Sequence, residues 1–191
     1  MAIIQYLTNL GDLAVLLPLS ALVLAWLLFR PRWDAAFWWV LSVALCSAAT
    51  AILKIFNNAC PDAISANTSG HTSLSLLVYG AIFLLVSARY GKWQRAILAS
   101  AGIALALAIA VSRVLVGAHS ITEVVIGMMI GSASLAIFLI GFRRTFPVEL
   151  PIWPLAVPAI LVVLLLNGHQ LETADIFQSF GGYLHQIGIC G

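Results

Sequence analysis

The fold of this chain is decided by residues 96–142, which read AILASAGIALALAIAVSRVLVGAHSITEVVIGMMIGSASLAIFLIGF. Two apolar runs, 96–116 and 121–142, are separated by a short connection. A helix needs about 20 mostly apolar residues to cross roughly 30 Å of hydrocarbon, so each run predicts a membrane span. The polar side chains that lie close to the connection are Ser112, Arg113, His119 and Glu123. The stretch therefore predicts a helical hairpin with its polar groups gathered at one membrane face.

The composition of the whole chain agrees with an integral membrane protein. Of its 191 residues, 62% are hydrophobic and only 8% are charged, and the mean hydropathy is +1.07. A soluble domain is about a quarter charged, because a surface that faces water needs polar cover. This composition excludes a secreted mini-protein, a nucleic-acid binder and a disordered chain. It leaves a single integral membrane domain over residues 1–191.

The apolar runs predict an all-α bundle of six transmembrane helices. These spans are 13–29, 35–56, 72–88, 96–116, 121–142 and 153–167. The sixth is short and contains prolines, but the uninterrupted apolar run at 161–165 favours a span over a re-entrant segment. Residues 1–12 lack the basic n-region and the A-x-A site of a cleavable signal peptide. We expect them to form an interfacial amphipathic segment, and residues 168–191 to form an exposed tail.

The basic residues predict the orientation in the membrane. Seven of them fall in alternate connections, namely Arg30, Arg32, Arg89, Lys92, Arg95, Arg143 and Arg144. By the positive-inside rule these connections are cytoplasmic, so both termini and the connections 57–70 and 117–120 face outward. In a bacterial inner membrane the outward side is the periplasm. Lys54 and Arg113 break the pattern at the outer ends of their spans, and the simple alternative is that they snorkel to lipid phosphates.

Polar residues in such a chain are costly to bury in a membrane, so their positions are informative. They gather at the outward ends of the spans and include Lys54, Ser69, Gly70, His71, Arg113, His119 and Glu123. The start of a helix offers unpaired N–H groups and a positive dipole end to an anion. An arginine fork and a lysine ammonium add charge that suits phosphate oxygens. The cluster therefore predicts a phosphate site.

Two parts of this cluster admit two interpretations each. Ser69 could donate to an oxyanion that Gly70 lets approach the backbone, or it could simply cap the helix. His119 and Glu123 are four residues apart and share a helical face. A carboxylate on one imidazole nitrogen fixes the tautomer and leaves the other nitrogen free to attack phosphorus. Ser120 and Glu123 also have the spacing of a capping box, and the sequence leaves both roles open.

The remaining histidines and cysteines carry weaker expectations. His169 and His185 lie in the predicted tail and are expected to be surface residues. Cys60 and Cys190 both face outward, where an oxidising periplasm would permit a disulfide. Cys46 lies in the middle of a span and is expected to pack there. Three cysteines are too few for a disulfide scaffold and lack the spacing of metal ligands.

The spacing of these motifs resembles that of the PAP2 (type 2 phosphatidic acid phosphatase) superfamily. Ser112-Arg113 followed after five residues by His119 is similar to the third signature of that family. Ser69-Gly70-His71 resembles the second, and Lys54 followed by Pro61 resembles the first. The resemblance implies a six-helix membrane phosphatase that works through a phosphohistidine and uses no metal or other cofactor.

The resemblance also implies a role for each matching residue. His119 would be the nucleophile, Glu123 its orienting carboxylate, and His71 the group that protonates the leaving oxygen. The residues that would hold the phosphoryl oxygens are Lys54, Ser69, Gly70 and Arg113.

Three positions depart from the family pattern. Cys60 stands before Pro61, where the family has arginine, and no arginine occurs in residues 57–70. Thr68 stands where the second signature begins with proline, and Glu123 where the third ends in aspartate. The side chains expected to replace part of the missing arginine are Asn57, Asn58 and Thr68. The pattern fits a divergent enzyme or one with slow turnover.

The sequence therefore predicts a phosphatase of lipid phosphates or diphosphates, with its site at the periplasmic face of a bacterial inner membrane. Undecaprenyl diphosphate, phosphatidylglycerol phosphate, phosphatidate and a lipid A phosphate all fit, and the sequence does not choose between them. The alternatives are a lipid phosphotransferase and a non-catalytic protein that binds or transports a lipid phosphate. Retention of both imidazoles favours catalysis. The expected partners are the lipid and its bilayer, without nucleic acid, and the sequence does not indicate an oligomeric state.

Overall fold

The fold is all-α over the described part of the chain, as the sequence predicts. A computed structural model describes residues 2–29, 32–60, 67–143, 152–171 and 174–187. The helices are α1 Ala2–Leu10, α2 Leu13–Leu28, α3 Trp33–Ala59, α4 Gly70–Ser87, α5 Lys92–Leu115, α6 Ile121–Arg143, α7 Trp153–Leu166 and α8 Ala174–Gln186. Several residues invoked above lie outside the described ranges, namely Arg30, Pro61, Arg144 and Cys190.

Fewer helices of the described residues are long and apolar enough to span a membrane than the sequence predicts. Four helices, α3 to α6, are long and apolar enough to cross a membrane, and α1 with α2 makes a fifth if this pair, bent by 42°, is one span. α7 is apolar but has only 14 residues. The structure thus supports four to five spanning helices in the described residues, and the prediction of six is not confirmed. The reason is length, because α2 and α7 end before they reach the rise that a full crossing needs.

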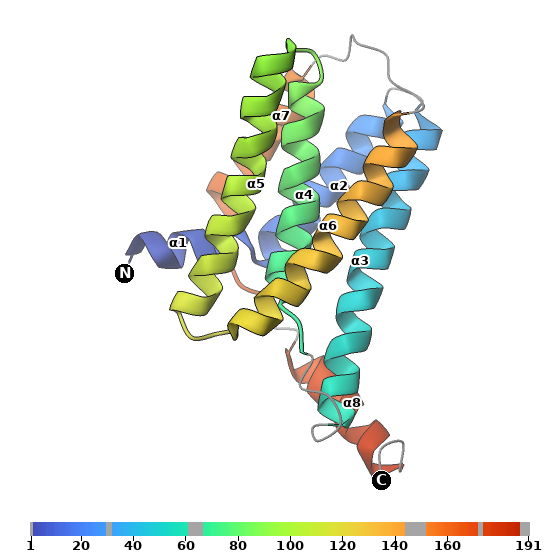
Figure 1. The fold of residues 1–191 in the computed structure, drawn as a ribbon, viewed down its shortest axis with the longest axis vertical. Helices are drawn as coiled ribbons and strands as arrows, with labels where there is room; N and C mark the ends of the chain where they lie inside the picture. The colour runs from blue at the N-terminus through green and yellow to red at the C-terminus, as the bar shows by residue number, and fades with distance from the viewer. Residues whose placement is uncertain (1, 30–31, 61–66, 144–151, 172–173, 188–191) are drawn as a thin grey trace.

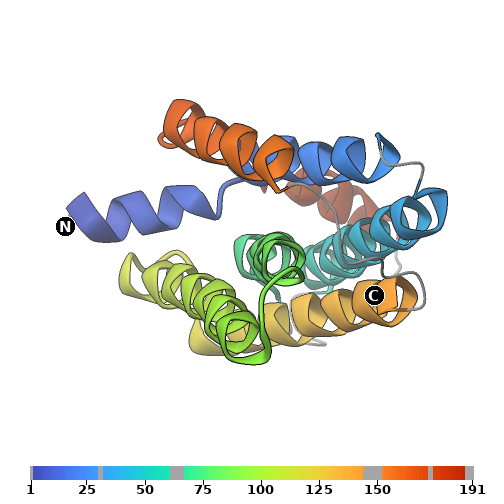
Figure 2. The same cartoon turned by 90° about the horizontal axis from the view of Figure 1, so that it is seen from above.

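α4 is the central helix of the bundle. In Figures 1 and 2 it lies between the α5–α6 pair on one side and α2 with α7 on the other, with α3 alongside. In its most apolar 18-residue window 72% of the residues are buried, against 28% for α3 and for α5. The outer helices instead expose apolar side chains, as lipid-facing helices do. α4 therefore forms the core against which the other elements are placed.

Small residues let α6 approach α4 closely. A Cβ at Gly131 would lie 2.5 Å from the backbone oxygen of Ser73, and one at Gly127 would lie 2.7 Å from that of Ser69. Glycines four residues apart form such a contact face on membrane helices. This contact places the start of α6 beside the start of α4.

The N-terminal segment forms a separate helix that projects from the bundle. α1 projects sideways in Figure 2, and its hydrogen bonds to the bundle include one to α5 and one to α4. Thr8 Oγ1 donates to Ser112 Oγ at 2.9 Å, and Tyr79 Oη donates to the Leu10 carbonyl oxygen at 2.7 Å. The helix stops at Gly11, where a Cβ would lie 2.6 Å from Ile109 Cγ2. A close backbone approach therefore fixes the bend between α1 and α2.

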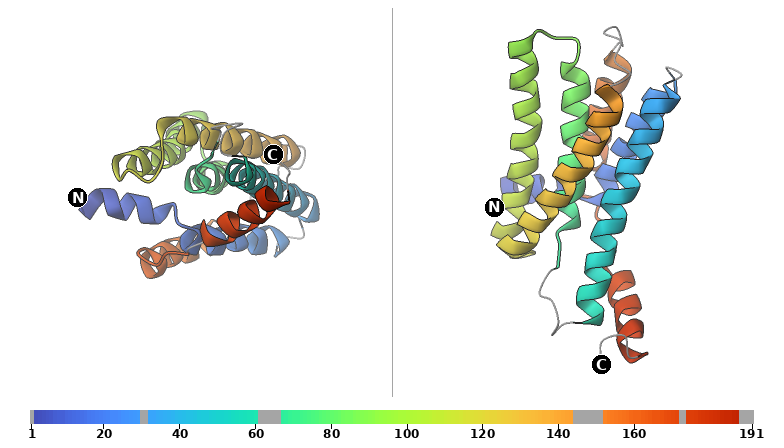
Figure 3. Two further views of the ribbon diagram at one scale, coloured as in Figure 1. Left: turned by 90° about the horizontal axis from the view of Figure 1, so that it is seen from below. Right: turned by 45° about the vertical axis from the view of Figure 1, so that its right-hand side comes forward.

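The predicted tail is exposed over most of its described residues, and it forms a helix, α8. α8 packs along the last turns of α3 (Figure 3). A Cβ at Gly181 would lie 2.5 Å from Asn58 Cβ, and the Ala59 carbonyl oxygen is 2.9 Å from His185 Nδ1. Cys60, next in the chain, is disulfide-bonded, while its expected partner Cys190 lies outside the described ranges. His169 is exposed, as predicted.

Candidate functional site

The candidate residues occupy one end of the bundle, where α3 and α5 end and α4 and α6 begin (Figure 1). They are Lys54 on α3, Ser69 capping α4, Gly70 and His71 in its first turn, Arg113 in the last turn of α5, His119 in the connection, and Glu123 in the first turn of α6. The described basic residues Arg32, Arg89, Lys92 and Arg95 lie near the helix ends of the opposite side. The bundle therefore has one end with the candidate chemistry and one end with the loop cations.

Ser69 joins the starts of two helices. Its Oγ accepts hydrogen bonds from Thr72 N at 3.4 Å and Thr72 Oγ1 at 3.0 Å, so it is the N-cap of α4. Its own N–H donates to the Glu123 carbonyl oxygen at 3.1 Å. The first N–H groups of the helix have no intrahelical partner, and those of Gly70 and His71 remain to face an anion. Of the two interpretations of Ser69, its contacts are those of a cap.

At Gly70, α3 lies close to this helix start. A Cβ there would lie 3.3 Å from Thr50 Cγ2 and 3.8 Å from Lys54 Nζ. The ammonium of Lys54 therefore points toward the start of α4 and not away from the bundle. Its Nζ is also 5.3 Å from the centroid of the Phe177 ring on α8, a cation–π distance. Lys54 thus stands between the helix start and the C-terminal helix.

His119 and Glu123 form the tightest pair of the site. Nδ1 of His119 lies 2.7 Å from Glu123 Oε2, and the same oxygen accepts from the Ser120 N–H at 3.1 Å. The Ser120 hydroxyl in turn accepts from the Glu123 N–H at 3.3 Å. The capping box and the histidine pair therefore coexist, because one carboxylate oxygen serves both. An imidazole that donates from Nδ1 leaves Nε2 with its lone pair exposed to a reactant.

The surroundings of His119 keep it neutral. Burial is the largest effect and lowers the pKa of His119, while the hydrogen bond to Glu123 opposes that shift. The positive charges of Arg113 and Lys54 lower the pKa of His119 further. A histidine shifted in this direction is unprotonated at pH 7, which a nucleophile requires. The effect of both charges on the pKa of His119 indicates that Arg113 and Lys54 lie near the imidazole.

Arg113 is held at the end of α5 with an unused donor. Its Nε is buried and has no hydrogen-bond partner within the described residues. Its backbone carbonyl oxygen accepts from the His119 N–H at 3.3 Å, which folds the connection back over the end of α5. A buried guanidinium nitrogen without a partner is costly. An anionic ligand would supply the missing acceptor.

Asp12 contacts the candidate residue His71, and sequence reasoning missed this contact. Its Oδ2 lies 3.4 Å from His71 Nε2, although the two residues are far apart in the chain. A Gly-Asp pair directly before an apolar run is an N-cap signal, and Asp12 does cap α2. That signal could have located the helix start but not the histidine. The contact depends on how α2 packs against α4.

The side chains expected to replace the missing arginine lie in two different places, at the end of α3 and directly before α4. Asn57 and Asn58 lie in the last turn of α3, and α8 packs against Asn58. Thr68 is fully buried, and its Oγ1 has no hydrogen-bond partner among the described residues. In the described part of the chain, neither asparagine side chain makes a hydrogen bond to a candidate residue. No arginine occupies this part of the site.

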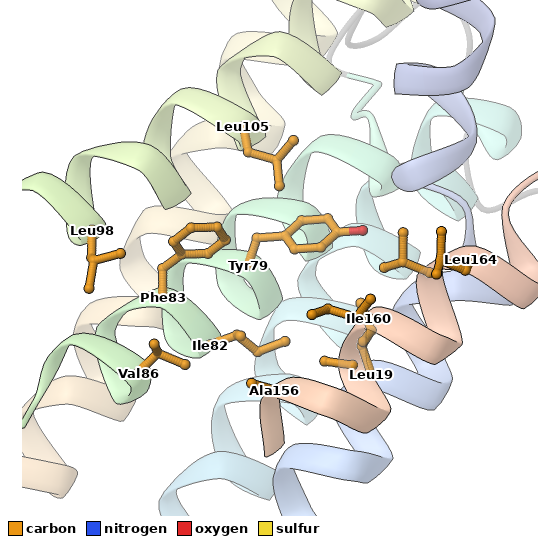
Figure 4. Close-up of a pocket in the computed structure, with 12 residues that line it drawn as sticks. Leu19, Tyr79, Ile82, Phe83, Val86, Leu98, Leu105, Ala156, Ile160 and Leu164 are labelled. Carbon is orange, nitrogen blue, oxygen red and sulfur yellow. The ribbon is translucent and has the colours of Figure 1, made fainter. Parts of the chain in front are cut away.

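Two apolar cavities lie deeper in the bundle than the polar cluster. One, of about 290 Å³, is lined by side chains of α2, α4, α5 and α7, and Figure 4 shows Tyr79 and Phe83 of α4 in its wall. The other, of about 280 Å³, lies between α4, α5 and α6 and extends from Thr72 to Leu139. Thr72 also bonds the capping Ser69. The second cavity therefore adjoins the start of α4, below the connection that carries His119.

Comparison with known proteins identifies the class of this protein. The family model described as PAP2 superfamily matches residues 35–147, more than half of the chain. The chain belongs to the PAP2 superfamily, and the resemblance drawn from its signatures is confirmed. Membership supports phosphatase activity on phosphorylated substrates. Asp12, α7 and α8 lie outside the matched region.

A curated relative shares most of the length of this chain. It is described as "Uncharacterized 22.5 kDa protein in cps region" of Klebsiella pneumoniae, and it is 30% identical over 146 residues. The alignment covers 74% of this chain and 70% of the relative. No solved structure gives a significant match. In the described part of the chain, no group of three or more His, Cys, Asp or Glu side chains is arranged to hold a metal ion.

Proposed function

We propose that the protein is a membrane phosphatase that hydrolyses a lipid phosphate or diphosphate through a phosphohistidine intermediate. The observation that carries the proposal is the 2.7 Å contact between His119 Nδ1 and Glu123 Oε2. With Nδ1 occupied, Nε2 is the free nucleophile beside two cations and a helix N-terminus. This arrangement fits phosphoryl transfer, in which positioning and charge neutralisation supply most of the catalysis.

In the first step, the lone pair of His119 Nε2 attacks phosphorus and an N–P bond forms. The bond from phosphorus to the oxygen of the rest of the lipid breaks, and its electron pair stays on that oxygen. His71 gives this oxygen a proton, so the leaving group departs as a neutral alcohol or a protonated phosphate. Glu123 stabilises the positive charge that develops on the His119 ring.

In the second step, water attacks the phosphorus of the phosphohistidine. The neutral His71 takes the proton of that water, the N–P bond breaks, and its electron pair returns to His119. Inorganic phosphate is released and both histidines regain their starting protonation states. Throughout, the groups that hold the phosphoryl oxygens are Lys54, Arg113 and the backbone at Gly70, as proposed from their positions around the helix start.

A lipid substrate is favoured by what lies beneath the polar cluster. The cavity between α4, α5 and α6 is lined almost wholly by apolar side chains and begins at Thr72. A chain anchored there would place its head group at the start of α4. Prenyl diphosphates and phosphorylated glycerolipids both meet this description, and the proposal does not distinguish them.

We place the site at the periplasmic face of a bacterial inner membrane. The support is the distribution of loop cations, which lie at the end of the bundle opposite to the candidate site. Substrate heads in the outer leaflet would then reach the site from the periplasm.

A non-catalytic lipid-phosphate binding protein is the second candidate, and a phosphotransferase, in which an alcohol replaces water in the second step, is the third. The binding protein is favoured by one observation, the absence of an arginine from residues 57–70. Such a protein would hold lipid phosphates with the same cations and release no phosphate.

The deciding experiment measures phosphate release from a panel of lipid phosphates and diphosphates in detergent with EDTA. Wild type should release phosphate, and His119→Ala should be inactive. His169→Ala is the matched control, because His169 is exposed and outside the cluster. Acid quenching with labelled substrate should trap an acid-labile phosphoprotein in wild type alone. Binding without turnover in wild type would favour the second candidate.

A further inference from the structure

We propose that Asp12 is a positioning residue for His71, the group that protonates the leaving oxygen. The inference rests on the proposed function and extends it to a residue outside the family signatures. Asp12 Oδ2 lies 3.4 Å from His71 Nε2. The pair resembles the contact of Glu123 with His119, so each histidine of the site has its own carboxylate.

The structure holds the Asp12 carboxylate in a fixed orientation. Its Oδ1 accepts from the Ala14 N–H at 2.9 Å and from the Leu171 N–H at 3.0 Å, which leaves Oδ2 for His71. The side chain is only 8% exposed. Two backbone donors from different parts of the chain thus orient an acid whose other oxygen points to the imidazole.

The backbone around Asp12 is seated directly on the first turns of α4. A Cβ at the preceding Gly11 would lie 3.4 Å from His71 Cβ and 3.2 Å from Ser75 Oγ. The carbonyl oxygen of Leu10 accepts the hydrogen bond of Tyr79, two turns further along the same helix. The bend between α1 and α2 is therefore anchored at two levels of α4, and Asp12 cannot move away from His71 without breaking these contacts.

The charges around His71 explain why a carboxylate matters there. The cations that act on it are Arg113 from α5 and Lys54 from α3, and the carboxylate that acts on it is Asp12 from the bend between α1 and α2. Two nearby cations oppose protonation of an imidazole, and an ionised carboxylate favours it. Burial opposes ionisation of Asp12, but hydrogen bonds from His71, Ala14 and Leu171 outweigh it and keep the pKa of Asp12 below its ordinary value. Asp12 is therefore ionised at neutral pH.

The contact also selects the working nitrogen of His71. Because Nε2 faces Asp12, Nδ1 is the nitrogen left to give a proton to the leaving oxygen and to take one from water. A carboxylate that orients a general acid in this way affects only steps in which that acid transfers a proton. This property separates a positioning role from a merely structural one.

The test compares Asp12→Asn with wild type on two substrates. Asparagine keeps the shape and the capping oxygen but loses the charge. For a lipid phosphate, whose alkoxide must be protonated, we expect kcat/KM to fall about tenfold or more. For p-nitrophenyl phosphate, whose phenolate leaves without a proton, we expect a change of about twofold or less. The basic limb of the lipid-phosphate pH profile should move to lower pH. Asp34→Asn, at the opposite end of the bundle, should match wild type on both substrates.

Two further variants keep the test decisive. Asp12→Ser retains a capping hydroxyl and should repeat the substrate difference if Asp12→Asn is poorly folded. In a His71→Ala background, Asp12→Asn should cause no further loss. Equal losses on both substrates with an unmoved basic limb, or additive losses in the double variant, would overturn the inference. A wild type that hydrolyses neither substrate would reject the proposed function itself, and the inference with it.

Discussion

At the scale of single residues, one carboxylate oxygen of Glu123 carries two hydrogen bonds. Oε2 accepts from the Ser120 N–H as a helix cap and lies 2.7 Å from His119 Nδ1. The cap holds the glutamate in place and thereby orients the imidazole. Glutamate at this position is longer than the aspartate of the family pattern, yet the sharing of one oxygen lets it reach both partners.

The first prediction concerns the pH dependence of His119. Burial lowers the pKa of His119 below its ordinary value of 6.5, while Glu123 acts to raise it. His119 therefore stays neutral down to a pH below 6.5. Because protonation of His119 removes the nucleophile, the acid limb of kcat/KM for p-nitrophenyl phosphate should lie below pH 6.5. Glu123→Gln removes the raising effect, so the acid limb should move to still lower pH while the plateau falls about tenfold or more. A limb that moves upward in Glu123→Gln would contradict the assignment.

The second prediction concerns the guanidinium of Arg113. Lysine keeps the charge but loses the planar fork that binds two phosphoryl oxygens. Residues 57–70 contain no second arginine to bind the phosphoryl oxygens. Arg113→Lys should therefore lower kcat/KM by about tenfold or more, measured as phosphate release from a lipid phosphate. Arg89→Lys, at the opposite end of the bundle, is the matched control. Full activity in Arg113→Lys would mean that phosphate is not held at this position.

At the scale of elements, the site depends on how closely α4 and α6 pack. The contact of Gly127 and Gly131 with the α4 backbone sets the two helix starts side by side, and the bond from Ser69 N to the Glu123 carbonyl oxygen joins them. The start of α4, which carries His71, and the start of α6, which follows His119, are thereby held next to each other.

The third prediction concerns this helix contact. A Cβ at Gly131 would lie 2.5 Å from a backbone oxygen, an approach that α4 can relieve only by moving away. Gly131→Ala should therefore destabilise the protein by about 1–3 kcal/mol and lower phosphate release together with the melting temperature in detergent. Gly182→Ala on α8 is the control, because a Cβ there meets no atom within 4 Å. Unchanged melting of Gly131→Ala would show that the contact is looser than the structure has it.

At the scale of the whole molecule, polar chemistry and loop cations occupy opposite ends of the bundle. The candidate site lies where α3 and α5 end, and Arg32, Arg89, Lys92 and Arg95 lie near the other end. By the positive-inside rule, the end that carries these basic residues lies in the cytoplasm. The arrangement makes the orientation testable by labelling.

The fourth prediction is the outcome of that labelling. Single cysteines introduced at the N-terminus and in the connection between α3 and α4 should react with a membrane-impermeant thiol reagent added to whole cells permeabilised only at the outer membrane. A cysteine introduced at Lys92 should react only after the inner membrane is opened. The native cysteines, replaced by serine, provide the background measurement. Reaction of the Lys92 position from outside would reverse the orientation and move the proposed site to the cytoplasmic face.

The sequence by itself determined the class of fold, most helix bounds and the family. Hydrophobic run length is a local property, and it placed α6 at 121–142 where the structure has Ile121–Arg143. Fixed spacings within one connection, such as that from Arg113 to His119 and Glu123, are local as well. For this reason the motifs and the pairing of His119 with Glu123 could be predicted from residues a few positions apart.

Only the tertiary structure decided which distant residues meet. Three contacts join segments far apart in the chain. They are the contact of Asp12 with His71, the packing of α8 on α3 and the contact of the Lys54 ammonium with the Phe177 ring. Such contacts depend on helix packing and on the bend at Gly11, which no local pattern encodes. The same is true of the span count, because whether α1 and α2 together form one span depends on the angle of the bend between them. The length of an apolar run and the spacing of a motif are properties of the linear sequence. The contact of the Asp12 carboxylate with His71 instead forms only when the bend between α1 and α2 packs against α4.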